Sequence, residues 1–195
     1  MIFCKNYIEP PFDKREILRY AGCRGAADEI LPLADSCIDE VKNKLTYKTC
    51  YSRLDVKISG DLCDFGVFSC RSRSLALNLR DCRSAVLFAA SVGFEIDRLI
   101  TRYGRISPAR ALMLDAIGAE RIEALCDAFC ADIEREYNQR ARPRFSPGYG
   151  DLPLEMQGDI FKILTPEKNI GLFLTDSMLM SPSKSVTAIV GLSNG

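Results

Sequence analysis

The sequence predicts an α+β fold in which helices pack on a mixed or antiparallel sheet. Apolar residues recur at helical spacing over 26–45 and 119–137, which is typical of amphipathic helices. The segment 46–58 is rich in β-branched and aromatic residues, as strands are. The chain has 195 residues, of which 47% are apolar, enough to bury one core.

We therefore expect a single domain over residues 1–195. Its first part, 1–118, combines helices with a hairpin. Its second part, 119–195, holds a long helix, a loop and the C-terminal strands.

The N-terminal segments are expected in the following order. Asp13 caps a short helix that ends near Tyr20, because its carboxylate can accept from the first free N–H groups. A longer helix covers about Ala26–Leu45. A strand over Thr46–Ile58 then forms a hairpin with a second strand over Leu62–Cys70.

The middle of the chain is mostly helical. The apolar segment Ala85–Ala90 fits either a buried strand or a helix, and a helix over Phe94–Tyr103 follows. Ser107-Pro108 marks a helix start, a capping hydroxyl with proline in the first turn. Gly118 allows a break or bend before the next helix, Ala119–Tyr137. One face of that helix carries charged residues that we interpret as solvated: Glu120, Asp127, Glu134 and Arg135.

The C-terminal segments alternate between helix and strand. Asp151 is expected to cap a helix over Leu152–Leu164, and Ile170–Thr175 is expected to be a strand. A turn at Ser181–Lys184 leads into the last strand, Ser185–Leu192.

Charge and hydropathy exclude several classes of function. Lys and Arg total 26, as do Asp and Glu, so no overall field attracts nucleic acid or an anionic membrane. The only basic clusters, 71–73 and 140–144, have acidic residues nearby. The apolar run 85–94 is too short to cross a bilayer, and Met1–Lys5 does not start a signal peptide. We expect a cytoplasmic protein.

The chain has nine cysteines and no histidine. The cysteines are scattered, form no CxxC motif and predict reduced, mostly buried thiols without a metal site. Cys126 and Cys130 share a helix face with apolar residues and predict core packing. Without histidine, Ser-His and Cys-His nucleophiles are excluded, so we expect binding and no catalytic residue. A thiol-based redox enzyme is an alternative, which requires one cysteine with a depressed pKa.

The stretch 142–151, "RPRFSPGYGD", is a candidate ligand loop. The guanidinium of Arg144 can pair with a carboxylate through two parallel hydrogen bonds. Pro147 stiffens the loop, and Gly148 lets the backbone approach a ligand. Tyr149 offers a flat face to a ring or a cation. The alternative is a surface turn with a solvated arginine.

This loop resembles the Arg-x-x-x-Gly-Tyr loop of the activation domain of cobalamin-dependent methionine synthase. The segment 174–187, "LTDSMLMSPSKSVT", resembles the Leu-Thr-Glu-Ser segment of that family, with its Met-x-Pro turn and the strand after it. "RYAGCRG" and "VLFAASVGFEIDRLI" resemble small stand-alone relatives of the domain.

The resemblance implies a site for S-adenosylmethionine. Arg144 would be the partner of the ligand carboxylate, and backbone groups of the loop would hold the rest. Ser177 and Ser185 would shape the cleft wall, although hydroxyls satisfied by a tight turn are the alternative. The implied residues are Arg144, Ser146, Pro147, Gly148, Tyr149, Ser177 and Ser185.

The resemblance also implies an accessory role in methionine biosynthesis. The chain would present S-adenosylmethionine for reductive methylation of cobalamin held by a partner, a corrinoid-binding methionine synthase or related methyltransferase. The alternative is an adaptor that no longer binds S-adenosylmethionine. Arg19 stands where the family has an aspartate, and the sequence ends soon after the last strand.

Overall fold

A five-stranded antiparallel sheet forms the centre of the computed structural model, which describes residues 1–23 and 30–194. The strand order is β1-β2-β6-β10-β7, and all four neighbouring pairs are antiparallel. The strands are β1 (Phe3–Tyr7), β2 (Tyr47–Asp55), β6 (Ser84–Ser91), β7 (Arg140–Ala141) and β10 (Ser185–Ser193).

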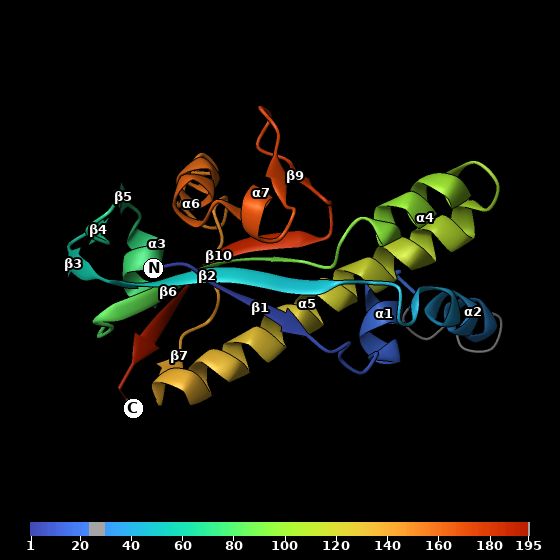
Figure 1. The fold of residues 1–195 in the computed structure, drawn as a ribbon, viewed down its shortest axis with the longest axis horizontal. Coiled ribbons are helices and arrows are strands. Elements are labelled where there is room, and N and C mark those ends of the chain that lie inside the picture. The colour runs from blue at the N-terminus through green and yellow to red at the C-terminus, as the bar shows by residue number, and fades with distance from the viewer. Residues whose placement is uncertain (24–29, 195) are drawn as a thin grey trace.

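Helices cover both faces of this sheet (Figure 1). The long helix α5 (Pro108–Tyr137) lies along one face, with α1 (Lys14–Tyr20), α2 (Leu31–Val41) and α4 (Glu95–Gly104) packed against it. The other face carries α6 (Met156–Leu164), with the short helices α3 (Arg73–Asn78) and α7 (Pro166–Asn169). This arrangement confirms the expected α+β class.

The central strand β6 shows why both faces must be covered. All eight of its residues are buried. Phe88 packs in the cluster on the α5 face, whereas Leu87 packs in the cluster on the α6 face. A strand apolar on both faces is stable only between two helical layers, so Ala85–Ala90 is a strand.

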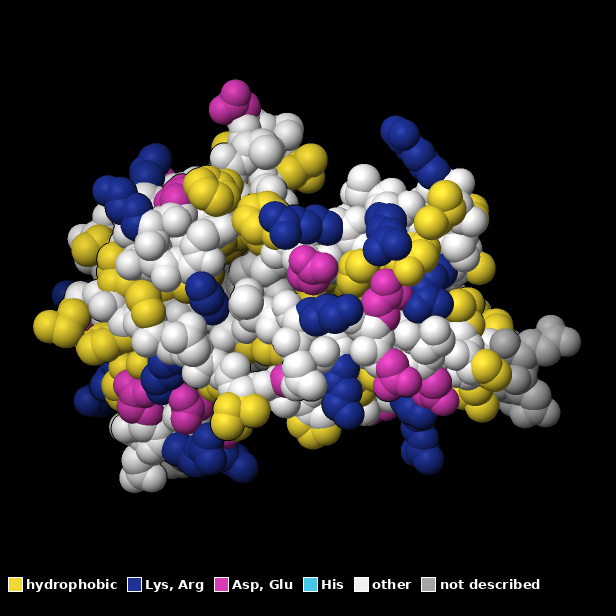
Figure 2. Space-filling model, turned by 45° about the vertical axis from the view of Figure 1, so that its right-hand side comes forward, with side chains coloured by type: hydrophobic (Ala, Val, Ile, Leu, Met, Phe, Trp, Pro, Cys, Tyr) yellow, Lys and Arg dark blue, Asp and Glu magenta, His cyan; other side chains and the backbone are white. Residues whose placement is uncertain are grey.

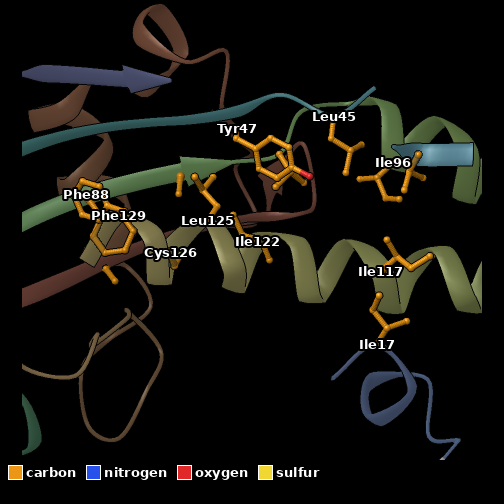
Figure 3. Packing of buried hydrophobic residues seen from close by; sticks show 14 of the residues in the cluster. Ile17, Leu45, Tyr47, Phe88, Ile96, Ile117, Ile122, Leu125, Cys126 and Phe129 are labelled. Carbon is orange, nitrogen blue, oxygen red and sulfur yellow. The ribbon is translucent and has the colours of Figure 1, made fainter. Parts of the chain in front are cut away.

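The α5 face contains the larger core (Figure 3). Phe129 on α5 lies against Phe88, with ring centroids 4.6 Å apart, and also meets the edge of the Tyr51 ring at 5.3 Å. Cys126 is fully buried in the same cluster, and Cys130 is partly buried against it. The prediction that these two cysteines serve core packing is confirmed.

Two small sheets flank the main one. The first contains β3 (Lys57–Ser59), β4 (Leu62–Asp64) and β5 (Ser69–Arg71), and the second contains β8 (Phe173–Leu174) and β9 (Met180–Ser181). The expected strand over Leu62–Cys70 is thus two strands, because Gly66 at φ +78° turns the chain between them. The expected strand over Thr46–Ile58 also divides, and β3 is the part that pairs with β4.

The prediction of a helix break at Gly118 is wrong, because α5 runs through it without interruption. A Cβ at this position would lie 2.9 Å from Lys184 Cγ and 3.0 Å from Ile96 Cγ1. The glycine therefore leaves room for two packed side chains.

The prediction that Asp151 caps a helix from Leu152 is also wrong. That helix is α6, which begins at Met156. The Asp151 carboxylate instead accepts hydrogen bonds from Arg73 N (2.8 Å) and Ser74 N (3.0 Å), at the start of α3.

The other helical predictions are confirmed with shifted ends. Asp13 caps α1 by accepting from Arg15 N and Glu16 N. The helix expected over Ala26–Leu45 is observed as Leu31–Val41, and residues 26–29 of that prediction lie outside the described residues. One predicted strand is also shorter than expected: of Ile170–Thr175, only Phe173–Leu174 form a strand, β8.

Candidate functional site

The loop after β7 runs along strand β10. Arg142 N donates to Gly191 O (2.8 Å), and Phe145 exchanges two hydrogen bonds of 2.9 Å with Ile189. Neighbouring residues of an extended segment point to opposite faces. Accordingly, Phe145 enters the core on the α6 face, and Arg144 reaches the acidic residues of α5.

Arg144 is held by two carboxylates of α5. Its Nη2 lies 2.6 Å from Glu123 Oε2, and its Nη1 pairs with Asp127 Oδ1. The arginine side chain is 24% exposed. Burial disfavours its charged form, but the carboxylates outweigh that effect and raise the pKa of Arg144. Its charge is therefore fixed at every ordinary pH.

The two partners of Arg144 line an acidic cleft of about 430 Å³ between α1 and α5. Carboxylates dominate its wall. The lining residues are Pro10, Pro11, Asp13, Glu16, Tyr20, Glu120, Glu123, Ala124 and Asp127. Arg144 itself lines a second, shallower cleft of about 370 Å³, and Asp127 borders both. The guanidinium thus lies at the boundary of the acidic cleft.

A buried ion pair builds the N-terminal wall of this cleft. Arg121 is fully buried, pairs with Glu120, and donates to Pro10 O and to Pro11 O (2.7 Å). Its guanidinium also lies over the Phe12 ring, 3.9 Å from the centroid. These contacts hold the segment before α1 against α5.

The interpretation of Glu120 as part of a solvated face is therefore wrong. The Glu120 side chain is 5% exposed, because the N-terminal segment covers it and Asp13 N donates to its carboxylate at 3.2 Å. Asp127, Glu134 and Arg135 are exposed as expected.

Arg19 lies beside the acidic cleft without lining it. Its Nε donates to Glu16 Oε2 at 2.7 Å, and its guanidinium lies 4.1 Å from the centroid of the Tyr20 ring. Both of these neighbours line the cleft. Arg19 is thus tied to the cleft wall.

The other loop residues form a tight turn. Tyr149 N donates to Ser146 O at 3.1 Å, and Gly148 N donates to Leu152 O at 2.9 Å. Gly148 has φ +84°, a conformation that favours glycine. Pro147 is buried, whereas Tyr149 is 68% exposed with its ring against Phe145. The Tyr149 ring is therefore free to contact a ligand or a partner.

The hydroxyls of Ser177 and Ser185 each have a partner within the chain. The Ser185 hydroxyl is buried and donates to Ser91 Oγ at 2.9 Å. The Ser177 hydroxyl lies 3.0 Å from Thr175 Oγ1 in the β8–β9 turn. Neither of these hydrogen bonds involves Arg144. The Ser177 contact is the kind that the turn alternative requires, whereas Ser185 pairs across the sheet with β6.

The turn before β10 docks on the opposite end of α5. Ser183 N donates to Asp97 Oδ2 at 2.8 Å, and Lys184 Nζ lies 2.7 Å from Asp115 Oδ1. The second sequence motif is thus fixed to α4 and to α5, the helix that also carries both partners of Arg144.

Charged residues of both signs also line other clefts, such as one of about 550 Å³ beside Asp81, Glu134, Arg140 and Arg142. Figure 2 shows basic and acidic side chains interspersed over one face, as the equal charge totals imply. Across residues 1–23 and 30–194, no cluster of three or more Cys, Asp or Glu side chains is arranged to hold a metal ion. None of the helices described has the length and hydropathy needed to cross a membrane.

Sequence reasoning proposed Arg144 as a site residue but did not place Glu16, Glu123 or Asp127 beside it. The one available signal was that Glu123 and Asp127 are four residues apart and so share a helix face. Nothing local indicates that Glu16 of α1 lies on the same cleft, because α1 packs on α5 only in the folded chain.

Comparison with known proteins agrees with the fold and with the sequence motifs. Residues 81–194 match the family model described as the activation domain of vitamin B12 dependent methionine synthase. The chain is similar to a solved structure, the MetH reactivation domain bound to AdoHcy, with a TM-score of 0.72 and 15% identity. That similarity covers 98% of this chain and 78% of the other. A search of curated protein sequences gives no match.

Proposed function

Because this chain belongs to the family of vitamin B12-dependent methionine synthase activation domains, we propose that it binds S-adenosylmethionine as an accessory protein. It presents the methyl donor to a corrinoid that a partner chain holds, a methionine synthase or a related corrinoid methyltransferase. Its role is to support reductive methylation, which converts an oxidised, inactive corrinoid back into the active form needed for methionine biosynthesis.

The observation that carries this proposal is the position of Arg144 at the boundary of an acidic cleft. S-adenosylmethionine has a carboxylate, an ammonium and a sulfonium. A guanidinium beside several carboxylates complements that charge pattern, because it pairs with the carboxylate while the acidic wall attracts the two cationic groups. The exposed Tyr149 ring extends from the same loop, but it packs against Phe145 and lines neither the acidic cleft nor the cleft beside Arg144.

The chemistry requires positioning and no proton transfer by this chain. The sulfonium methyl is already electrophilic, and its transfer to a nucleophile leaves a neutral thioether without any step for a general base. A chain that contains no histidine suits such a role. Its residues would bind the donor, orient the methyl group and exclude water.

The corrinoid is assigned to a partner because this chain has no histidine to ligate cobalt. The chain would therefore act by docking on the partner chain that holds the corrinoid.

A second candidate is an adaptor that keeps the fold but binds no S-adenosylmethionine. Two contacts favour it: Arg144 is already paired with Glu123 and Asp127, and Arg19 with Glu16. In that case the two arginines stabilise the wall between α1 and α5 and do not bind a ligand.

Calorimetric titration of S-adenosylmethionine into the purified chain separates the two candidates. We expect saturable heat, and weaker binding of S-adenosylhomocysteine, which lacks the sulfonium charge. An absence of heat at millimolar ligand would leave the adaptor.

A further inference from the structure

Two of the nine cysteines lie directly opposite each other in the small β3-β4-β5 sheet. Cys63 on β4 is paired in register with Cys70 on β5. Residues directly opposite in an antiparallel pair project from the same face, so the two sulfur atoms are neighbours. Cys63 is fully buried, whereas Cys70 is partly exposed.

The hydrogen bonds on either side define the geometry of this pair. Ser72 N donates to Asp61 O (2.9 Å), and Phe65 N donates to Phe68 O (3.0 Å). These bonds lie two positions to either side of the cysteines, so Cys63 and Cys70 occupy a hydrogen-bonded position of the ladder. Such pairs have Cα atoms about 5.5 Å apart, within the range of about 4.4–6.8 Å that a disulfide spans. Their Cβ atoms are also about 5.5 Å apart, wider than the roughly 3.5–4.5 Å of a relaxed disulfide, and a bond that departs from this geometry is more easily reduced.

The surrounding contacts keep the two strands in place. The Phe65 and Phe68 rings stack with centroids 4.6 Å apart across the turn, and the Asp64 carboxylate accepts from Gly66 N at 2.8 Å. At the other end, the Ser72 hydroxyl donates to Asp151 at 2.5 Å. A bond between the two sulfur atoms therefore requires no sliding of the strands, only that the two Cβ atoms draw together.

The two thiols also differ in acidity. A hydrogen bond from Cys63 lowers the pKa of Cys70, and the same bond together with burial raises the pKa of Cys63. Burial raises the pKa of other cysteine thiols, namely Cys37, Cys50, Cys82, Cys126 and Cys130. Cys70 is thus the more accessible thiol of the pair and the one whose pKa the neighbouring thiol lowers, which makes it the better candidate for the attacking sulfur.

We propose that Cys63 and Cys70 form a redox-active dithiol that hydroperoxides convert into an intrachain disulfide. The Cys70 thiolate attacks a peroxide oxygen, the O–O bond breaks, and Cys70 becomes a sulfenic acid while an alcohol or water leaves after protonation. The Cys63 sulfur then attacks Cys70, the S–O bond breaks and water leaves. Two thiols and one hydroperoxide give one disulfide, one alcohol and one water, and a reducing dithiol reverses the change.

A second pair provides an internal comparison. Cys4 and Cys50 are also opposite in register, across β1 and β2. Burial raises the pKa of Cys50 to about 12, so its thiol stays protonated. We expect this pair to react more slowly than Cys63 and Cys70, although its register is equally favourable.

The test uses the intact reduced chain, a molar equivalent of hydrogen peroxide and alkylation with N-ethylmaleimide. Cleavage after Lys57 and Arg71 releases one peptide, 58–71, that contains both cysteines. We expect this peptide to lose two hydrogens in mass and to escape alkylation until it is reduced. Cys4 and Cys50 fall in separate peptides, 1–5 and 49–53, so their disulfide would appear as a cross-linked species.

Two variants distinguish the roles of the thiols. Cys70→Ser should slow the consumption of peroxide at least about tenfold, because the nucleophilic thiolate is gone. Cys63→Ser should leave Cys70 trapped as a sulfenic acid that dimedone labels. Cys4→Ser, which removes an exposed thiol, should change neither result. Retention of both thiols in peptide 58–71 while other cysteines oxidise would overturn the proposal, as would a disulfide that forms only in urea.

Discussion

Arg144 Nη2 lies 2.6 Å from Glu123 Oε2, so the guanidinium proposed to receive a ligand carboxylate is already paired within the chain. Asp127 supplies its second partner. A ligand carboxylate must therefore join or replace these contacts. Because Asp127 is 72% exposed, it is the partner that solvent can most readily compensate, and Nη1 is the atom that we expect to turn towards a ligand.

Replacing Arg144 tests the proposed binding site directly. We expect Arg144→Ala to weaken S-adenosylmethionine binding by about 100-fold, the loss of about 2–3 kcal/mol expected for a charge-assisted pair. Arg144→Lys should also weaken binding, because an ammonium cannot form two parallel hydrogen bonds with a carboxylate. Isothermal titration calorimetry measures both.

The matched control is Arg135→Ala, which removes another arginine beside α5 carboxylates. Arg135 is 77% exposed and pairs with Asp132, away from the cleft. Its loss should leave the affinity unchanged. If Arg144→Ala changes the affinity less than threefold while its circular dichroism matches the unaltered protein, Arg144 is not the anchor.

The buried pair of Glu120 and Arg121 should dominate the stability of the cleft wall. In Arg121→Met, Glu120 is left buried without its partner, and the carbonyls of Pro10 and Pro11 lose their donors. Removing one member of a buried pair typically costs about 3–5 kcal/mol. Urea unfolding should show that loss as a lower midpoint.

A double variant separates the charge effect from lost packing. Glu120→Leu combined with Arg121→Met removes both charges, and buried pairs replaced by apolar residues are often neutral in stability. We expect the double variant to be more stable than Arg121→Met alone. A loss below about 1 kcal/mol in Arg121→Met would mean that water reaches Glu120 and that the wall is loosely packed.

Local signals in the sequence were sufficient for much of the fold. The Asp13 cap, the apolar spacing of α4 and α5 and the β-branched content of β10 lie within the segments that they specify. By contrast, β1 and α3 were not predicted. β1 pairs with residues 47–51, and α3 takes part of its cap from Asp151. Both depend on contacts that are distant along the chain.

The candidate site likewise contains residues that a local motif predicts and residues that only tertiary packing brings together. Arg144 and the glycine turn after it follow from a local motif, and Gly148 has the positive φ that such a turn needs. The acidic partners could not be found in this manner. From the sequence alone, a carboxylate on a helix face is expected to be solvated. Glu16 and Glu123 line one cleft only because residues 10–20 pack on α5 in the folded chain.

Gly118 is predicted to act through packing rather than through backbone freedom. In Gly118→Leu the new side chain would enter the space of Lys184 and Ile96, and overpacking of this kind costs about 1–3 kcal/mol. Thermal unfolding should show a lower Tm. The control is Gly158→Ala in α6, where a Cβ meets nothing within 4 Å. Helix propensity should there raise stability by about 0.5–1 kcal/mol. A stabilising Gly118→Leu would contradict the packing role.

Asp151 should make the junction between the ligand loop and α3 sensitive to acid. The Ser72 hydroxyl, with the N–H groups of Ser74 and Arg73, lowers the pKa of Asp151 well below its ordinary value. A carboxyl with a depressed pKa in the folded state stabilises that state above its unfolded pKa of about 3.9, and the contribution is lost as the pH falls further.

Asp151→Asn removes the ionisable group and should therefore remove this part of the pH dependence. We expect the variant to have a lower Tm than the unaltered chain at neutral pH, where the carboxylate is charged and accepts from three donors. As the pH falls below about 3.9 the two Tm values should draw closer, because the unfolded carboxyl is protonated first. They should meet only below the depressed pKa of the folded Asp151, where the carboxyl is neutral in both states. Circular dichroism melts across that range measure the difference. Parallel curves would show that the carboxylate contributes nothing through its charge.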